Sequence, residues 1–309
     1  MKSQSITTVS DENKADDYAP RCTILTPCTL FRYFFSWKSM ILLASTFITI
    51  FLMNVCNAFA YRRMPTDAPL PDVVADSWKQ FGYLRNSKSY MKHQPADLLS
   101  ITLTVICSVL GIFKWNTINV PKLAMVYICS LYLRMLFFSV TGLPPPCIGY
   151  PNCPCAVKPW SSIAANHSIP KIAFVYTFAI GLFVGEIPQC GDLTMSGHTI
   201  YLWVLGLFII DSLTKFMSPK ALVLAKIPLI CVLLFVSCTI VFIRNHYAID
   251  VVLAIVYVNM LWKLYSLGQV FLSISQEPFS SSRIGKILKW LEKDMDAKNE
   301  DSLFDVDSA

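Results

Sequence analysis

Residues 221–268 have the sequence ALVLAKIPLICVLLFVSCTIVFIRNHYAIDVVLAIVYVNMLWKLYSLG. Two apolar runs, about 221–243 and 248–268, are joined in this stretch by the short polar segment 244–247. Roughly 20 consecutive apolar residues form a helix long enough to cross a lipid bilayer. The stretch therefore predicts two consecutive membrane-spanning helices with a polar link between them.

The composition of the whole chain agrees with a membrane protein. Hydrophobic residues make up 54% of the chain, charged residues only 15%, and the mean hydropathy is +0.51, whereas soluble domains have about 25% charged residues. Four more spans are predicted at about 39–60, 97–114, 121–140 and 199–217. The sequence thus predicts an all-α, polytopic membrane protein with six transmembrane helices. A seventh apolar stretch, 169–187, either crosses the membrane or is re-entrant.

Three regions are predicted along the chain. Residues 1–38 form a cytosolic N-terminal segment that does not resemble a cleavable signal, so the first span is predicted to be a signal anchor. Residues 39–270 form the transmembrane catalytic domain, and residues 271–309 form a cytosolic tail. In the tail, Ile284, Ile287, Leu288 and Leu291 recur at helical spacing among cations, which predicts a short helix lying on an anionic leaflet; the acidic residues beyond are predicted to be disordered.

The distribution of basic residues favours six spans with both termini in the cytosol. This topology places most cations of the later loops and of the tail on the cytosolic side, as the positive-inside rule requires. Those cations are Lys114, Lys122, Lys215, Lys220, Lys263, Arg283, Lys286 and Lys289. The first exoplasmic loop is an exception, because it also carries several cations. With six or seven spans alike, the hairpin 199–243 brings His198 and His246 to the same membrane face.

The two histidines are the predicted catalytic residues. His246 precedes Asp250 by four residues, and residues at this spacing share one face of a helix. Asp250 is expected to accept a hydrogen bond from one ring nitrogen of His246, leaving the other for a nucleophilic attack. His198 would serve as general acid and base. The alternative is that the histidines are boundary residues capping two apolar helices, which leaves the clustering of three such groups unexplained.

Four other residues are predicted to bind substrate or to position the site. Arg134 lies inside an apolar run, where a cation is costly unless it meets a phosphate or an acidic partner. Ser196 and Gly197 expose backbone N–H groups at a helix start, which favours an anion. Asp192 is expected to orient His198 rather than to contact a phosphate. The alternatives are an ion pair for Arg134 and simple helix capping for Ser196 and Gly197.

The cysteines and the net charge bear on two other classes of function, metal binding and nucleic-acid binding. Five of the eleven cysteines lie inside apolar segments, whereas Cys147, Cys153, Cys155 and Cys190 lie in polar loops where an oxidising compartment would pair some of them. No zinc-ligand spacing is present, so neither a metal nor another cofactor is expected. The net charge of +6 comes from scattered cations without a nucleic-acid motif, and no nucleic-acid partner is predicted.

The chain carries the segments PLPDVVAD (69–76), Arg134 through LPPP (143–146), CGDLTMSGHT (190–199) and HYAIDV (246–251). In this order they resemble the four motifs of the sphingomyelin synthase family, membrane transferases related to type 2 phosphatidic acid phosphatases. The resemblance implies His246 as nucleophile, Asp250 as its orienting residue and His198 as acid and base.

The resemblance also implies a reaction. A phospho-headgroup would pass from a glycerophospholipid to ceramide through a phosphohistidine, releasing diacylglycerol, in the Golgi or plasma membrane with the site facing the lumen or exterior. Phosphocholine is favoured over phosphoethanolamine because loop aromatics suit a quaternary ammonium, and inositol stays open. The sequence also leaves a homo-oligomer open.

Two other functions compete with this interpretation. A lipid phosphate phosphatase would use the same histidines with water as acceptor. However, its Ser-Arg pair, expected about six residues before the nucleophile, is replaced by Thr239 and Ile240. A non-enzymatic transporter would use Arg134 and the histidines as a polar path. It does not explain why they cluster with Asp250 at one face.

Overall fold

The structure is a computed structural model, and it describes residues 36–65, 67–77, 95–112, 119–147, 153, 168–178, 194–215, 217–274 and 277–291. These residues form helices and connecting segments, with no strand among them. The long helices are α2 (Trp37–Arg62), α6 (Pro95–Gly111), α7 (Asn119–Val140), α11 (Gly197–Leu213), α12 (Pro219–Phe242) and α13 (Ala248–Ser273). The shorter ones are α3 (Val73–Ser77), α10 (Ile169–Phe178) and α14 (Glu277–Ser280). The all-α class is therefore confirmed, and the helices follow the predicted spans to within a few residues.

Four of the long helices, α2, α7, α12 and α13, are long and apolar enough to cross a membrane. The other two, α6 and α11, are apolar helices of 17 residues. At 1.5 Å per residue, 17 residues extend about 26 Å, close to the roughly 30 Å thickness of a bilayer core. A multi-pass membrane protein is therefore confirmed, while six crossings stay a prediction.

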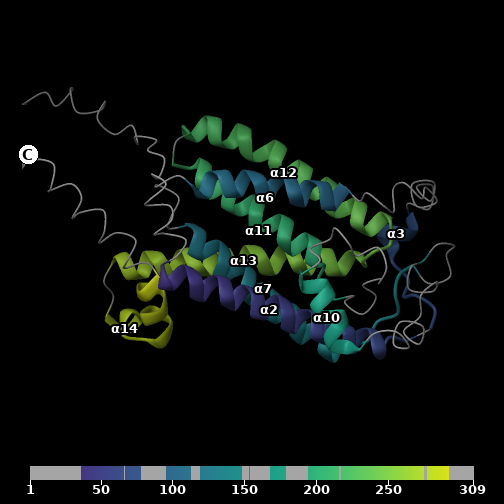
Figure 1. Ribbon diagram of the computed structural model, residues 1–309. Helices are drawn as coiled ribbons and strands as arrows, with labels where there is room; N and C mark the ends of the chain where they lie inside the picture. Colours follow the sequence, from purple (N-terminus) through teal and green to yellow (C-terminus); the bar gives the residue numbers. More distant parts are fainter. Residues whose placement is uncertain are drawn as a thin grey trace, which may run out of the picture.

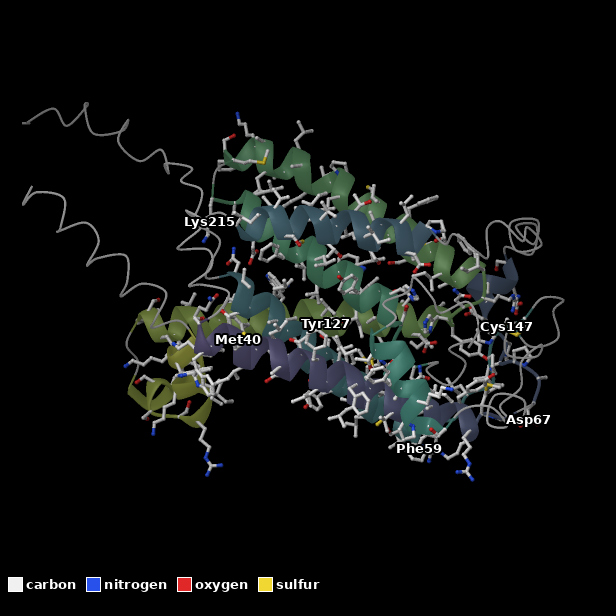
Figure 2. The ribbon with its side chains drawn as sticks, viewed as in Figure 1. Met40, Phe59, Asp67, Tyr127, Cys147 and Lys215 are labelled. Carbon is white, nitrogen blue, oxygen red and sulfur yellow. A yellow bond between two sulfur atoms is a disulfide. The ribbon has the colours of Figure 1, made fainter. Side chains whose placement is uncertain are left out.

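The helices form one elongated bundle with two distinct ends (Figure 1). At one end, called here the histidine end, lie α3 and the starts of α6, α11 and α13. At the other, called the tail end, lie α14 and the start of α2. Figure 2 places Asp67 and Cys147 at the histidine end and Met40 and Lys215 at the tail end.

The central helix of the bundle is α11, which packs against α6, α7, α12 and α13. Between its polar ends its side chains are apolar on every face and mostly buried, including Leu202, Val204 and Phe208, as expected for a helix surrounded by others. Helix α2 packs against both α7 and α10. Many outward-facing residues of the outer helices are exposed and apolar, which suits contact with lipid. They include Leu43, Phe47, Ile101, Val105, Leu224, Phe235, Val252 and Val256.

The tail end is closed by a polar contact between three helices. Lys122 of α7 is only 3% exposed and forms an ion pair with Asp211 of α11. The indole N–H of Trp262 in α13 donates to the same carboxylate at 3.0 Å, and the Lys122 ammonium lies 4.4 Å from the centre of that indole ring. The same charges act on Lys215, just beyond α11. Burial lowers the pKa of Lys215, and the nearby charge of Lys122 lowers it further, whereas Asp211 raises it. The contact of Lys122, Asp211 and Trp262 joins α7, α11 and α13 at the end far from the histidines.

The segment between α7 and α11 leaves and returns at the same end of the bundle. Thr141, just after α7, lies beside Thr194, just before α11, with their hydroxyl oxygens 2.8 Å apart. Helix α10 lies in this segment and contacts α2, where Asn54 donates to the Thr177 hydroxyl at 3.0 Å. The predicted stretch 169–187 is thus helical over Ile169–Phe178, and its remainder lies outside the described residues.

Candidate active site

His246 lies in the link between α12 and α13, two residues before α13 begins. Its side chain is 6% exposed, and that of Asp250 is fully buried. The Nδ1 atom of His246 lies 3.8 Å from Oδ2 of Asp250, which is longer than a hydrogen bond. The two groups are neighbours as predicted, but the expected hydrogen bond is not formed here.

The physical reason for their proximity also differs from the prediction. Asp250 is the third residue of α13, and its Oδ2 accepts the backbone N–H of Tyr247 at 3.0 Å, as the acidic residue of a capping box does. His246 precedes the helix instead of sharing a helical face with Asp250. Within the described part of the chain, His246 Nδ1 and Asp250 Oδ1 are buried without a hydrogen-bond partner. A movement of about 0.8 Å would bring the imidazole to hydrogen-bond distance, and such contacts often tighten only when substrate binds.

His198 is the second residue of α11 and is about one-third exposed. Its Nε2 lies 3.2 Å from Oδ1 of Asp97, near the start of α6. Asp97 was not among the predicted site residues, and only its place at the edge of the predicted span 97–114 could have indicated it. Asp192, predicted to orient His198, lies outside the described residues.

The starts of α11 and α13 are joined directly. The backbone N–H of Ser196 donates to the backbone carbonyl of Asp250 at 3.2 Å. Ser196 also begins α11 as its N-cap, because its hydroxyl accepts the N–H of Thr199 at 3.3 Å. Because the starts of α11 and α13 are joined, the two histidines lie at the same end of the bundle, as predicted.

Arg134 of α7 lies against the first turn of α11. Its side chain is buried, and a Cβ atom added to Gly197 would lie 2.2 Å from Nη1 and 2.8 Å from Cζ of Arg134. Only a glycine leaves room for the guanidinium at this position. A helix start carries a partial positive charge, so the guanidinium and the first turn of α11 combine two positive potentials at one place, which favours an anion.

The first-loop segment 69–76 holds the link that carries His246. Asp72 begins α3, where its Oδ1 accepts the N–H groups of Val74 and Ala75. Its Oδ2 accepts the N–H of Ala248, the first residue of α13, at 2.7 Å. Four residues on, Asp76 pairs with Arg244 at 2.6 Å. Two carboxylates on one turn therefore hold the link on both sides of His246.

Tyr247 joins the same link to the second motif. Its hydroxyl donates to the carbonyl of Pro144 at 2.7 Å and accepts the N–H of Leu70 at 3.1 Å. Burial raises the pKa of Tyr247, and the nearby carboxylates of Asp250 and Asp72 raise it further, against the opposing effect of the Leu70 hydrogen bond. The phenol therefore keeps its proton and remains a donor. The first, second and fourth motifs, separated by up to 177 positions, meet at this one side chain.

Two residues near the histidines have a left-handed backbone. Met195 has φ of 59° and Arg244 has φ of 56°, and they are the non-glycine residues with positive φ in the part of the chain that the structure describes. Such a conformation costs roughly 1–2 kcal/mol per residue. Because strain of this kind gathers at functional sites, its occurrence just before both histidines favours a functional role for this end.

The histidine end also contains a disulfide. Cys147 and Cys153 are joined, with their Cα atoms 5.3 Å apart. The five cysteines of the apolar segments, Cys56, Cys107, Cys129, Cys231 and Cys238, are free thiols, as expected. Cys155 and Cys190 lie outside the described residues, as do the loop aromatics Trp78, Tyr83, Tyr150 and Trp160.

Comparison with known proteins shows what the region of the site is similar to. Residues 189–267 match the PAP2 superfamily C-terminal family, and this range contains His198, His246 and Asp250. The match supports an enzyme of the phosphatase and phosphotransferase kind, embedded in a membrane by the apolar helices described above.

A second comparison specifies the relatives further. The chain is 22% identical over 244 residues to the mouse protein sphingomyelin synthase-related protein 1. The aligned region covers 74% of this chain and 45% of that protein. The chain therefore spans less than half the length of the relative that it matches. Both matches point to the same group of proteins that the four motifs resemble, the sphingomyelin synthase and PAP2-related proteins.

Proposed function

We propose that the protein transfers a phospho-headgroup from a glycerophospholipid to the primary hydroxyl of ceramide and releases diacylglycerol. The observation that carries the proposal is the joining of two helix starts, one bearing His198 and one preceded by His246, with the Arg134 guanidinium against one of them. This arrangement offers a nucleophile, an acid and a positive potential for a phosphodiester.

In the first step, Nε2 of His246 attacks the donor phosphorus, because Nδ1 faces the carboxylate of Asp250. The bond between phosphorus and the diacylglycerol oxygen breaks, and that oxygen takes a proton from His198. The Asp250 carboxylate stabilises the positive charge that develops on the His246 ring. The headgroup phosphate is then carried on His246.

In the second step, His198 removes the proton of the ceramide hydroxyl as that oxygen attacks phosphorus. The bond between phosphorus and His246 breaks, and the histidine is restored. Asp97 lies 3.2 Å from Nε2 of His198, so this carboxylate orients the ring during both transfers. Each step inverts phosphorus, so the configuration is retained overall.

Arg134, Ser196 and Gly197 are proposed to bind the phosphate oxygens. The guanidinium supplies N–H donors in a planar fork that suits phosphate, and the first turn of α11 supplies backbone N–H groups. Both reacting groups of the lipids lie near the headgroup plane, so the position of the site at a helix end supplies proximity. Phosphocholine is the preferred headgroup in this proposal.

We also propose that six helices cross the membrane and that the histidine end faces the lumen or exterior of the Golgi or plasma membrane. The charge distribution supports this orientation, because the described basic residues of the tail end outnumber its acidic ones. The basic residues include Lys38, Lys122, Lys215, Lys220, Lys263, Arg283, Lys286 and Lys289, and the acidic ones are Asp211 and Glu277. The disulfide at the histidine end also suits an oxidising compartment.

The test is product analysis in membranes that contain the wild-type chain or the His246→Ala variant. Labelled ceramide is supplied with choline, ethanolamine and inositol phospholipids, and products are identified by mass spectrometry. The proposal expects labelled phosphocholine or phosphoethanolamine ceramide from the wild type alone, with retention at a chiral phosphorus. Donor hydrolysis that does not require ceramide would instead identify the second candidate, a lipid phosphate phosphatase, with which the PAP2 match is equally compatible.

A further inference from the structure

A short helix follows α14 at the tail end and covers residues 283–291. Ser282 begins it, because the hydroxyl of Ser282 accepts the N–H of Gly285 at 3.0 Å and its carbonyl accepts the N–H of Lys286 at 2.9 Å. The helix matches the one expected for the tail, but its surroundings differ from the expectation. The sequence predicts that its four apolar residues face a membrane together, and the structure divides them between two sides.

One side of this helix packs on the bundle. Leu288 and Leu291 are 7% and 2% exposed. A Cβ atom added to Gly268 of α13 would lie 2.7 Å from Cδ1 of Leu288, so the glycine makes room for that leucine. The Lys38 ammonium, near the start of α2, donates to the carbonyl of Trp290 and lies 5.0 Å from the centre of its ring. The helix is therefore attached to both α13 and α2.

The other side is exposed and carries two kinds of residue. Ile284, Ile287 and Trp290 are 65%, 51% and 40% exposed. Arg283, Lys286 and Lys289 are exposed among them. A short helix with apolar and aromatic residues beside cations, at the end of membrane-spanning helices, is typical of a segment lying at the interface between lipid and water.

We propose that residues 283–290 form a binding surface for anionic phospholipid headgroups in the leaflet at the tail end. An anionic partner is inferred from charge complementarity, because three exposed cations lie within seven residues without an acidic residue between them. The exposed isoleucines and Trp290 would enter the lipid while the cations contact the headgroups. Because Leu288 and Lys38 attach the helix to α13 and α2, the bound lipid would be held against the transmembrane bundle.

The magnitude of the lipid preference follows from the number of cations. Each basic residue near an anionic membrane surface contributes about a fivefold preference, so three contribute on the order of 100-fold. Screening by salt weakens this attraction. The preference for anionic lipid is therefore expected to fall as the salt concentration rises.

The test uses the purified full-length chain in nanodiscs of phosphatidylcholine with spin-labelled phosphatidylserine or phosphatidylcholine as probe. The wild type is expected to hold phosphatidylserine selectively. The variant Arg283→Gln, Lys286→Gln, Lys289→Gln is expected to lose most of that selectivity. The matched control Lys215→Gln, Lys220→Gln, Lys263→Gln removes three exposed cations from the same end and is expected to retain most of it.

Two outcomes would overturn the proposal. One is equal selectivity in the wild type and the tail variant, and the other is an equal loss in the tail variant and its control. A parallel measurement adds poly-glutamate, since an acidic protein would be an alternative partner. Binding of poly-glutamate by the tail cations, without selectivity for phosphatidylserine, would replace lipid by protein as the partner. Neither measurement depends on the reaction proposed for the histidine end.

Discussion

The substitution Gly197→Ala tests whether the start of α11 and Arg134 form one phosphate-binding unit. The added Cβ would lie 2.2 Å from Nη1 of Arg134, and ordinary van der Waals contact begins at 3.4 Å. The guanidinium must therefore move by about 1.2 Å, the difference between these two distances. A displacement of about 1 Å in a catalytic site costs on the order of 100-fold in rate, equivalent to about 2.7 kcal/mol of barrier.

The same substitution is not expected to unfold the protein. Alanine is favoured over glycine inside a helix by up to about 1 kcal/mol, and Gly197 is the first residue of α11. Loss of activity without loss of thermal stability would thus separate a local displacement of Arg134 from general damage. The assay is the rate of product formation from ceramide and a phospholipid donor in proteoliposomes, with the thermal unfolding midpoint of the same samples.

Gly111→Ala is the matched control. A Cβ atom at Gly111 would lie 3.8 Å from Val120 Cγ2, which is ordinary contact, and this residue ends α6 at the tail end. Its activity is expected to equal that of the wild type. If Gly197→Ala also kept activity within about threefold of the wild type, the proposed contact between Arg134 and the phosphate would be refuted.

Three further predictions concern the groups around the two histidines. Asp97→Asn should lower activity about tenfold, less than the roughly 100- to 10,000-fold contribution of a general acid–base group itself, because Asp97 acts through His198. Little change in stability is expected because the pair is exposed; rate and unfolding midpoint are measured together. Asp76→Asn should destabilise the protein by about 1–2 kcal/mol. This loss is smaller than that for breaking a fully buried ion pair, because Asp76 is 37% exposed. Denaturant unfolding in micelles measures the change in unfolding free energy. Tyr247→Phe should cost about 1–3 kcal/mol, because it leaves the buried carbonyl of Pro144 and the part-buried N–H of Leu70 without this partner, as the same unfolding assay would show.

The phenol of Tyr247 also predicts a dependence of stability on pH. Its pKa in the folded protein is raised above the ordinary value of 10.0. The stability that this group contributes is therefore complete below about pH 10 and is lost as the pH rises through its folded pKa. The difference in unfolding free energy between wild type and Tyr247→Phe should shrink in that alkaline range. A constant difference up to pH 12 would contradict the assignment.

The controls for these variants come from the same end of the bundle. Asp67 is exposed there, so Asp67→Asn should change neither activity nor stability. If Asp67→Asn lowered activity as much as Asp97→Asn, the effect would reflect net charge rather than the contact with His198. If Asp76→Asn were as stable as the wild type, the pair with Arg244 would not hold the link before His246.

The sequence by itself determined the membrane class, the helices and the end at which the histidines lie. Apolar runs such as 221–243 specify helices locally, because a chain in lipid must satisfy its backbone hydrogen bonds within each segment. The alternation of these runs with polar links then places His198 and His246 at one end without any knowledge of how the helices pack.

Only the tertiary structure decided which groups meet there. Asp97 reaches His198 across 101 positions of sequence, and Arg134 lies on Gly197 because α7 packs against α11. The role of the first-loop segment was also not evident, since Asp72 caps a helix that begins 176 residues later. Such contacts depend on the rotation and register of packed helices, which residue periodicity within one helix does not specify. For the same reason, Leu288 and Leu291 turned out to contact the bundle, although their spacing is the same as that of a membrane-facing stripe.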